Sequence, residues 1–167
     1  MIEACWLFDV PPSKVEILVH PQSIIHSLVE YDDGSQLAQL GTPDMKTPIA
    51  HALGFPERLI SGANFLDLTK TPALTFEEAD SETFDCLSLA IYAAERGGSY
   101  PLFLNAANEV AVQAFIEGKI KITQIADLVK NTLQFATENE PVSIDEVIEL
   151  DELARKYCLD SLKEIWK

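Results

Sequence analysis

The chain has 167 residues, a length typical of one domain or of one and a half, and 47% of them are hydrophobic, which is enough for a core. Its formal net charge of −15 argues against binding to nucleic acid or to an anionic membrane surface, because both call for basic residues. No apolar run approaches the roughly 20 residues that span a bilayer, and the first residues lack the basic leader of a signal peptide. Cys5, Cys86 and Cys158 are few and widely spaced, which indicates buried or half-buried thiols in a reducing compartment.

The first predicted elements are strands. Residues 15–20 form a short β-rich run, and residues 23–31 and 35–41 flank an Asp-Asp-Gly turn, which is a good hairpin signal. We therefore expect about three strands between Val15 and Leu40. In the second strand, alternation places Ile25, Ser27, Val29 and Tyr31 on one face and Ile24, His26, Leu28 and Glu30 on the other. Both faces are mixed, so we expect one of them to be covered by a helix, a subunit or an absent segment.

A helix is predicted over residues 45–55. Thr47 is placed as its N-cap, Pro48 as its first helical residue and Gly54 as its C-terminal stop. Residues 56–80 are typical of a loop, with a possible short strand at residues 74–76. The acidic stretch from residue 76 to residue 85 carries no basic residue and indicates a solvated connector.

The remaining chain predicts four helices, because apolar residues recur there at spacings of three and four. The first stripe ends at Gly97-Gly98, the second ends at Gly118, the third is capped by Thr123, and the fourth begins with a capping box over residues 143–146. The four stripes are Leu87, Ala90, Ile91 and Ala94; Phe103, Ala107, Val110, Ala111, Ala114 and Phe115; Ile125, Leu128, Val129, Thr132, Leu133 and Ala136; and Val147, Ile148, Ala154, Cys158, Leu162, Ile165 and Trp166.

The predicted fold class is α+β. A small, mostly antiparallel sheet built on a hairpin, together with a helix, is followed by an acidic C-terminal α-helical bundle. The chain divides near residue 80, into residues 1–80 and residues 81–167.

Histidines are the first candidates for chemistry. His20 and His26 are six residues apart, which is no recognised metal spacing, so a two-histidine site is disfavoured. His26 alone is the better candidate, because it lies on a strand beside Ser27 and could reach a pocket. The alternative is a hydrogen-bonded core or interface histidine, and spacing alone favours that alternative. His51, inside a predicted helix, is expected to be structural.

Two polar segments are further candidates. Residues 43–46 leave the end of a strand, where binding groups often lie, and Met45 could offer a soft apolar surface to a flat ring. The alternative is a turn at Pro43 with Met45 in the core. Asn105, Asn108 and Glu109 are placed at a helix start, with Asn105 as the default cap. Dinucleotide, P-loop and nucleophile-elbow motifs are absent from the sequence, and no acidic pair has a spacing that forces a shared metal ion.

The segment EILVHPQSIIHSLVEYDDGSQLAQLGTPDMKTPIAHALGFPERL closely resembles the 1-deoxy-D-xylulose 5-phosphate reductoisomerase family. The resemblance extends through SGANFLDL, ALTFEEAD, CLSLAIYAAERGG and LNAANEVAVQAFIEGKI, and weakens over roughly the last 25 residues. It implies an NADPH-dependent oxidoreductase and isomerase that uses Mg²⁺ or Mn²⁺, converts 1-deoxy-D-xylulose 5-phosphate to 2-C-methyl-D-erythritol 4-phosphate and serves non-mevalonate isoprenoid biosynthesis. It also implies a homodimer in the bacterial cytoplasm, with a plastid origin left open.

The same resemblance assigns roles to three residues and identifies parts of the family that lie outside the matched region. His26 matches a pocket-lining histidine near substrate and cofactor, and Pro43 and Met45 match residues beside the nicotinamide. The family's nucleotide-binding domain and metal carboxylates precede the matched region, and its NKGLE motif stands just ahead of the segment matching IEACWLF. Glu3 is therefore not a metal ligand. No metal ligand, bound cofactor or catalytic residue is expected in this chain alone.

The resemblance thus implies that residues 1–80 are a remnant of the catalytic and dimerisation domain with its connector, and that residues 81–167 are the supporting bundle. A truncated chain of this kind is predicted to be inactive alone. The alternative is a stand-alone acidic dimerisation or interaction module, because strands with mixed faces leave edges open for pairing. We expect a neighbouring copy to cover the hairpin.

Overall fold

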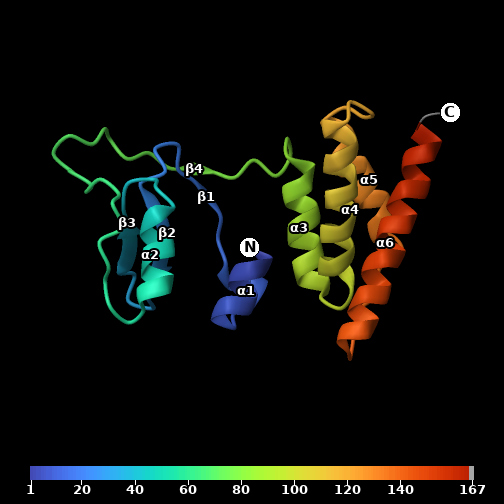
Figure 1. The fold of residues 1–167 in the computed structure, drawn as a ribbon, viewed down its shortest axis with the longest axis horizontal. Coiled ribbons are helices and arrows are strands. Elements are labelled where there is room, and N and C mark those ends of the chain that lie inside the picture. The colour runs from blue at the N-terminus through green and yellow to red at the C-terminus, as the bar shows by residue number, and fades with distance from the viewer. Residues whose placement is uncertain (166–167) are drawn as a thin grey trace. The chain divides into compact units, whose positions relative to one another are not determined.

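The computed structural model describes residues 1–165 of the chain, which form two compact units. One unit comprises Leu18–Ala79; the other combines Met1–Ile17 with the chain from Asp80 onward. Figure 1 shows short strands and α2 in the first unit and the long helices in the second. The α+β class with a helical C-terminal region is confirmed. The predicted division at residue 80 places residues 1–17 with the strands. In the structure they belong to the helical unit, because α1 (Ile2–Phe8) contacts α3 (Asp85–Arg96).

The hairpin forms as predicted, from β2 (Ile25–Glu30) and β3 (Gln36–Leu40) in antiparallel register. At its turn, Asp33 Oδ1 accepts hydrogen bonds from the backbone N–H and the hydroxyl of Ser35, at 2.9 and 2.6 Å. Gly34 adopts a φ of +80°, which glycine reaches without steric cost.

A β-bulge interrupts the hairpin at His26. Ile25 is opposite Leu40 and Ser27 is opposite Gln39, so His26 has no partner residue across the strands. The strict alternation predicted for residues 24–31 is therefore wrong at its start, because a bulge adds one residue to one strand and redirects its side chain.

The predicted third strand does not join the hairpin. Only Leu18–Val19 (β1) is extended, and it pairs antiparallel with Glu77–Glu78 (β4). Ser23, with a φ of +50°, lies in the turn that separates β1 from β2. Strand β4 lies just beyond the predicted strand at 74–76, inside the acidic stretch expected to be only a connector.

Helix α2 (Lys46–Gly54) begins one residue before the predicted cap. Asp44 Oδ1 accepts a hydrogen bond from the Lys46 N–H at 2.9 Å, so Asp44 performs the role assigned to Thr47. Gly54 is the last helical residue and not a stop beyond the helix. A Cβ at Gly54 would lie 2.5 Å from Leu59 Cγ, so a side chain there would require Leu59 to move.

The bundle consists of α3, α4 (Tyr100–Ile116), α5 (Thr123–Leu133) and α6 (Ile144–Ile165), and a short 3-10 turn, η1 (Pro12–Lys14), follows α1. Its core gathers one side of α4, α5 and α6 around Phe103, Leu128 and Cys158. The described helices include none that is long and apolar enough to span a membrane.

The predicted helix faces are confirmed to different degrees. All six residues of the third stripe are buried, but Phe115 of the second is 39% exposed and Val147 and Ile148 of the fourth are also exposed. In α3 only Ala93 is buried, and the four predicted residues there are half-buried. The predicted packing of Ile165 and Trp166 lies outside the side chains that the structure describes.

Two of the predicted helix caps differ in the structure. Ser143 accepts a hydrogen bond from the Glu146 N–H at 3.1 Å, which confirms this part of the capping box, although the Glu146 carboxylate accepts from Val142 N–H. Thr123 is the first helical residue and caps nothing; instead Gln124 Oε1 accepts from the Lys121 N–H at 2.8 Å.

An ion-pair cluster joins α4 to α6. The Arg155 guanidinium donates to Asp151 at 2.6 Å and to Glu109 of α4 at 2.6 Å. The hydrogen bond from Arg155 lowers the pKa of Glu109 below its ordinary value of 4.5. A lowered pKa contributes stability at neutral pH that is lost as the pH falls through the folded-state value.

Arg155→Met is expected to lower the Tm at neutral pH by about 2 °C, because an exposed ion pair contributes little. The difference from the unsubstituted chain should shrink below pH 4.5 as Glu109 becomes protonated. Thermal denaturation by circular dichroism across pH measures this. The control is Lys163→Met, since Lys163 bonds Asp160 within α6. A Tm difference that persists unchanged at acidic pH would contradict the assignment.

Candidate functional site

His26 is the centre of the candidate site, and both of its ring nitrogens are engaged. Nδ1 lies 3.1 Å from Gln39 Oε1 on β3, and Nε2 lies 3.0 Å from the carbonyl oxygen of Ser23. The bulge directs the ring toward the end of β3, where a Cβ placed on Gly41 would lie 3.8 Å from His26 Cε1. The residue is solvent-exposed within this chain, so it is not part of the core, and the interface alternative for His26 stays open.

The loop after β3 presents the second part of the site. Pro43 is exposed and Met45 is 70% exposed, so Met45 does not fill the core. The Thr42 hydroxyl donates to the Asn64 carbonyl at 2.8 Å and so fixes the start of this loop. The backbone hydrogen bond from Lys46 lowers the pKa of Asp44, which keeps that carboxylate ionised at the start of α2.

His20 and His51 do not join this site. His20 Nδ1 lies 2.8 Å from the Thr75 carbonyl oxygen, and its ring stacks on Phe76 with centroids 4.7 Å apart. Gln22 exchanges two hydrogen bonds with Thr75, so the HPQ segment holds the chain beside β4. His51 packs edge-on against Phe55. The structure thus assigns both of these histidines to the scaffold.

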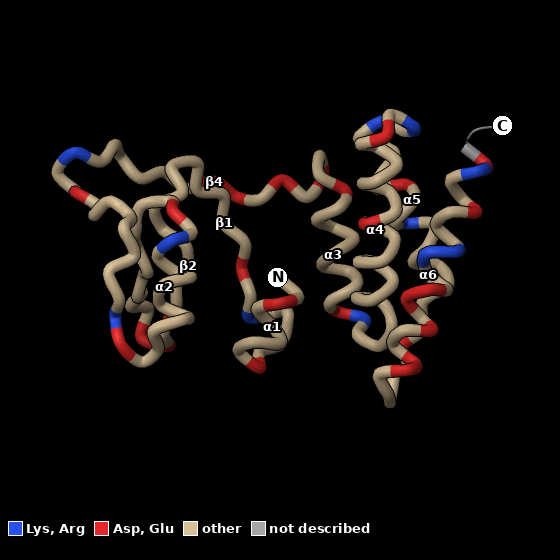
Figure 2. Tube along the Cα trace, viewed as in Figure 1, with Lys and Arg blue, Asp and Glu red and all other residues tan. Residues whose placement is uncertain are grey.

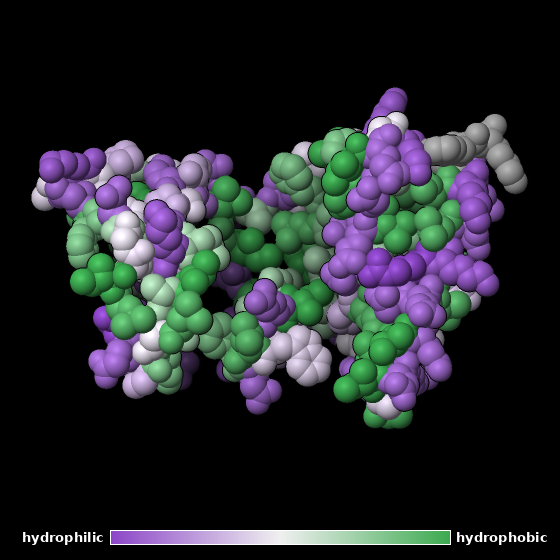
Figure 3. Space-filling model, in the orientation of Figure 1, coloured by the Kyte–Doolittle hydropathy of each residue, from purple (hydrophilic) through white to green (hydrophobic). Residues whose placement is uncertain are grey.

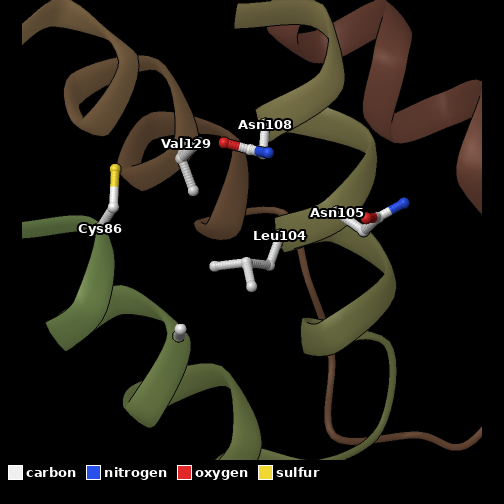
Figure 4. A pocket seen from close by; sticks show the side chains of 6 residues that line it. Cys86, Leu104, Asn105, Asn108 and Val129 are labelled. Carbon is white, nitrogen blue, oxygen red and sulfur yellow. The ribbon is translucent and has the colours of Figure 1, made fainter. Parts of the chain in front are cut away.

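Asn105 and Asn108 lie in the bundle, along a cavity of about 220 Å³ (Figure 4). Helix α4 begins at Tyr100, so Asn105 is not a cap; its amide donates to Glu109 at 3.2 Å within the helix. Cys86 also lines the cavity, and burial together with the charge of Asp85 raises the pKa of its thiol. A protonated thiol is a weak nucleophile, so this cavity offers no reactive group.

The three cysteines differ in burial. Cys158 is buried and Cys5 half-buried as predicted, whereas Cys86 is exposed. All three are free thiols.

The described residues differ in how well they suit a metal ion and how well they suit an organic cofactor. Across residues 1–165, no group of three or more His, Cys, Asp or Glu side chains could hold a metal ion together. A divalent cation therefore does not fit this part of the chain by itself. Pro43 and Met45 are both exposed and offer apolar surface at the start of the loop after β3.

Comparison with known proteins decides the family. The model of the DXP reductoisomerase C-terminal domain matches residues 40–157. The chain belongs to this family. The match extends from the end of β3, through the loop that carries Pro43 and Met45, to α6.

Curated members of the reductoisomerase family match nearly the whole chain. The 1-deoxy-D-xylulose 5-phosphate reductoisomerase of Acidithiobacillus ferrooxidans is 54% identical over 162 residues, which are 97% of this chain and 41% of the relative. That of Pseudomonas putida is 54% identical over 167 residues, or 98% of this chain and 41% of the relative. The chain thus spans about two-fifths of the length of these relatives.

Solved reductoisomerase structures share the fold. The enzyme of Zymomonas mobilis in complex with NADPH gives a TM-score of 0.90 at 48% identity, covering 96% of this chain and 42% of that one. A DOX-P reductoisomerase in complex with NADPH, fosmidomycin and magnesium gives 0.92 at 45% identity, covering 99% and 43%.

Sequence reasoning missed the partners that orient His26. Gln39 is one of several polar residues on β3, and no spacing rule distinguishes it from Gln36. A bulge brings Gln39 Oε1 to the His26 ring, and this bulge depends on the register of the two strands. The local order of polar and apolar residues does not determine that register.

Proposed function

We propose that this chain forms the C-terminal part of an NADPH- and divalent-metal-dependent 1-deoxy-D-xylulose 5-phosphate reductoisomerase. The product is 2-C-methyl-D-erythritol 4-phosphate, an intermediate of non-mevalonate isoprenoid synthesis. The observation that carries the proposal is the superposition, at a TM-score of 0.92 over 99% of the chain, on a relative in complex with NADPH, fosmidomycin and magnesium. The bacterial relatives support a place in the bacterial cytoplasm.

Within this function the chain contributes one wall of the reaction pocket. His26, Pro43 and Met45 line it, and the exposed apolar surfaces of Pro43 and Met45 bind one side of the nicotinamide and exclude water from it. Metal ligands come from the part of the relatives' length that this chain does not match, because the described residues form no suitable group. Bound NADPH supplies the hydride for the reductive half of the reaction.

The two parts of the chain have separate tasks. Residues 1–80 represent the back of the catalytic and dimerisation domain with its connector, and residues 81–167 form the supporting bundle. The buried core within α4, α5 and α6 supports the assignment of a bundle, to which residues 1–17 are also joined by the contacts of α1.

The reaction is tested by complementation. The chain is mixed with a polypeptide that covers the remaining length of the Acidithiobacillus ferrooxidans relative, and NADPH oxidation is followed with substrate and Mn²⁺. We expect turnover from the mixture and none from either polypeptide alone. Met45→Ala should raise the KM for NADPH, whereas Leu53→Ala, a change of another exposed apolar side chain, on α2, should leave it unchanged. Turnover by the chain alone at the rate of the intact relative would contradict the proposal.

Self-association is a second candidate function, favoured by the surface of the first unit. Of its apolar side chains only Ile24 is buried, while Leu28, Val29, Leu37 and Leu40 on the hairpin are exposed. Figure 3 shows apolar surface over this unit. A two-stranded hairpin is marginally stable alone, and each large side chain left uncovered forfeits about 1.5–3 kcal/mol.

We infer that a second copy of the chain covers this hairpin and that the protein is a homodimer. Light scattering should give the mass of a dimer, and Val29→Lys should reduce it to that of a monomer. A monomer whose hairpin amides are protected from hydrogen exchange would contradict this inference. A dimer that gains no activity from complementation would favour a stand-alone interaction module.

A further inference from the structure

Large apolar side chains are exposed where α6 begins. Val142 is 91% exposed, Ile144 is 79% exposed, and Val147 and Ile148 are also exposed. Ile144, Val147 and Ile148 are spaced by three and four residues, so they lie at neighbouring positions on the helix surface. Figure 3 shows apolar surface over this end of α6. We call these four residues the α6 patch, and exposed apolar groups of this kind are typical of interaction surfaces.

The segment that carries the α6 patch is held in place by its own hydrogen bonds. The Ser143 hydroxyl oxygen accepts from the Glu146 N–H at 3.1 Å, and the Glu146 carboxylate accepts from the Val142 N–H at 2.8 Å. The Ser143 carbonyl also accepts from the Val147 N–H at 3.1 Å. Because the backbone is already ordered, binding to this surface does not have to order it first.

The charges next to the α6 patch along the chain are all negative. Asp145 precedes Ile148 by three residues and Glu152 follows it by four, so both border the patch, and both are exposed. Neither of them forms a salt bridge with another residue among residues 1–165. No Lys or Arg occurs in residues 131–154, and Arg155 is engaged by two other carboxylates. The border therefore offers carboxylates that await a cation.

We propose that the α6 patch is a docking surface for a basic amphipathic helix of a partner protein. The large apolar side chains of such a helix cover the patch, and Lys or Arg on its flanks pair with Asp145 and Glu152. The apolar contact supplies the affinity, whereas the charge pairs at the rim set orientation and favour association. A second copy of this chain docked through the same patch would place like charges opposite each other, which disfavours self-association at this surface.

The opposite end of the bundle provides an internal contrast. Figure 1 shows that the loop between α4 and α5 lies at the other end of the bundle from the start of α6. Ile116 and Ile122 are exposed there, but Glu117 is paired with Lys119, and Lys121 follows in the sequence. A basic helix would meet lysines at that end, so exposed apolar surface alone does not create the same preference.

The test is fluorescence anisotropy of a labelled synthetic helical peptide, with leucine along one side and lysine on both flanks, titrated with the full chain. We expect saturable binding at physiological salt that weakens as the salt concentration rises, because charge pairs at an exposed rim are screened. The same peptide with glutamate in place of lysine, or with serine in place of leucine, should not saturate. Equal binding of either control peptide, or no saturable binding of the first, would overturn the proposal.

Substitutions locate the binding surface. Ile148→Ser should weaken peptide binding about tenfold, because it removes part of the buried apolar contact. Glu152→Gln should weaken it about threefold and reduce its salt dependence, as expected for one charge pair at the rim. Ile116→Ser is the matched control and should leave binding unchanged. Circular dichroism checks that each variant keeps its helices. Equal losses in Ile116→Ser and Ile148→Ser would overturn the proposal.

Competition separates an external partner from the rest of the relatives' length. The polypeptide used for complementation should not displace the peptide from the chain. Displacement would assign the α6 patch to that polypeptide and so overturn the proposal. Since no turnover is measured, this outcome is independent of the result of the complementation assay.

Discussion

Gly98→Ala is expected to lower the stability of the helical unit severely. Gly98 has a φ of +54°, and a Cβ there would lie 2.5 Å from the Thr137 carbonyl oxygen and from the Glu138 carbonyl carbon. These are backbone atoms, and they are held in place because Ser99 exchanges hydrogen bonds with Thr137 at 2.8 to 3.1 Å. The segment cannot yield without breaking those bonds. We expect a loss of about 3 kcal/mol, or roughly 10 °C in Tm, by thermal denaturation.

Gly118→Ala is the matched control, because it isolates the backbone conformation from the clash. Gly118 has a φ of +71°, but nothing lies within 4 Å of its Cβ position. Only the cost of a left-handed residue remains, about 1 kcal/mol. Equal losses of stability in the two variants would show that close approach at Gly98 is unimportant.

Phe103→Ala is the second substitution with a large expected effect. Phe103 is 1% exposed in the centre of the bundle, and truncation would leave a cavity among α4 and its neighbours. We expect a loss of about 3–5 kcal/mol in the free energy of unfolding. Urea denaturation followed by helical circular dichroism measures it.

Phe115→Ala is the control on the same helix. Phe115 was predicted on the same apolar stripe, but it is 39% exposed near the end of α4. Its truncation should cost about 1 kcal/mol, because Phe115 buries less apolar surface on folding than Phe103 does. A loss as large as that of Phe103→Ala would mean that the end of α4 is covered by something outside the described residues.

Helix faces could be predicted from the sequence where one side of the helix is fully buried. Leu128, Val129, Thr132 and Leu133 recur at helical spacing on α5, which has other helices against that side only. The prediction was weaker for α4, because Ala106 is buried and Phe115 is not. Alanine is small enough to lie where helices approach closely, and periodicity does not identify such positions.

Pairings between distant residues could not be predicted. Strand β1 pairs with β4 across more than fifty residues, and α1 packs with the bundle across an even longer separation. Local pattern carries no information on such contacts, which depend on the closure of long loops. Figure 2 also shows that acidic residues dominate the connector and the first half of α6, as composition implied.

The candidate site was predicted in part. His26 and the loop with Pro43 and Met45 were named from the sequence, and the structure exposes all three. Their role beside a nicotinamide stays a prediction. The hydrogen bonds that orient His26 depend on a one-residue bulge, so they emerge only from three-dimensional register.

As one wall of a reductoisomerase pocket, this chain is expected to need the remaining length of its relatives to bind metal and nucleotide. Calorimetric titration with NADPH and Mn²⁺ tests it most directly. The chain alone should take up neither ligand with saturable stoichiometry, and one equivalent of each should bind once the complementary polypeptide is added. Tight, stoichiometric binding of both ligands by the chain alone would contradict the account.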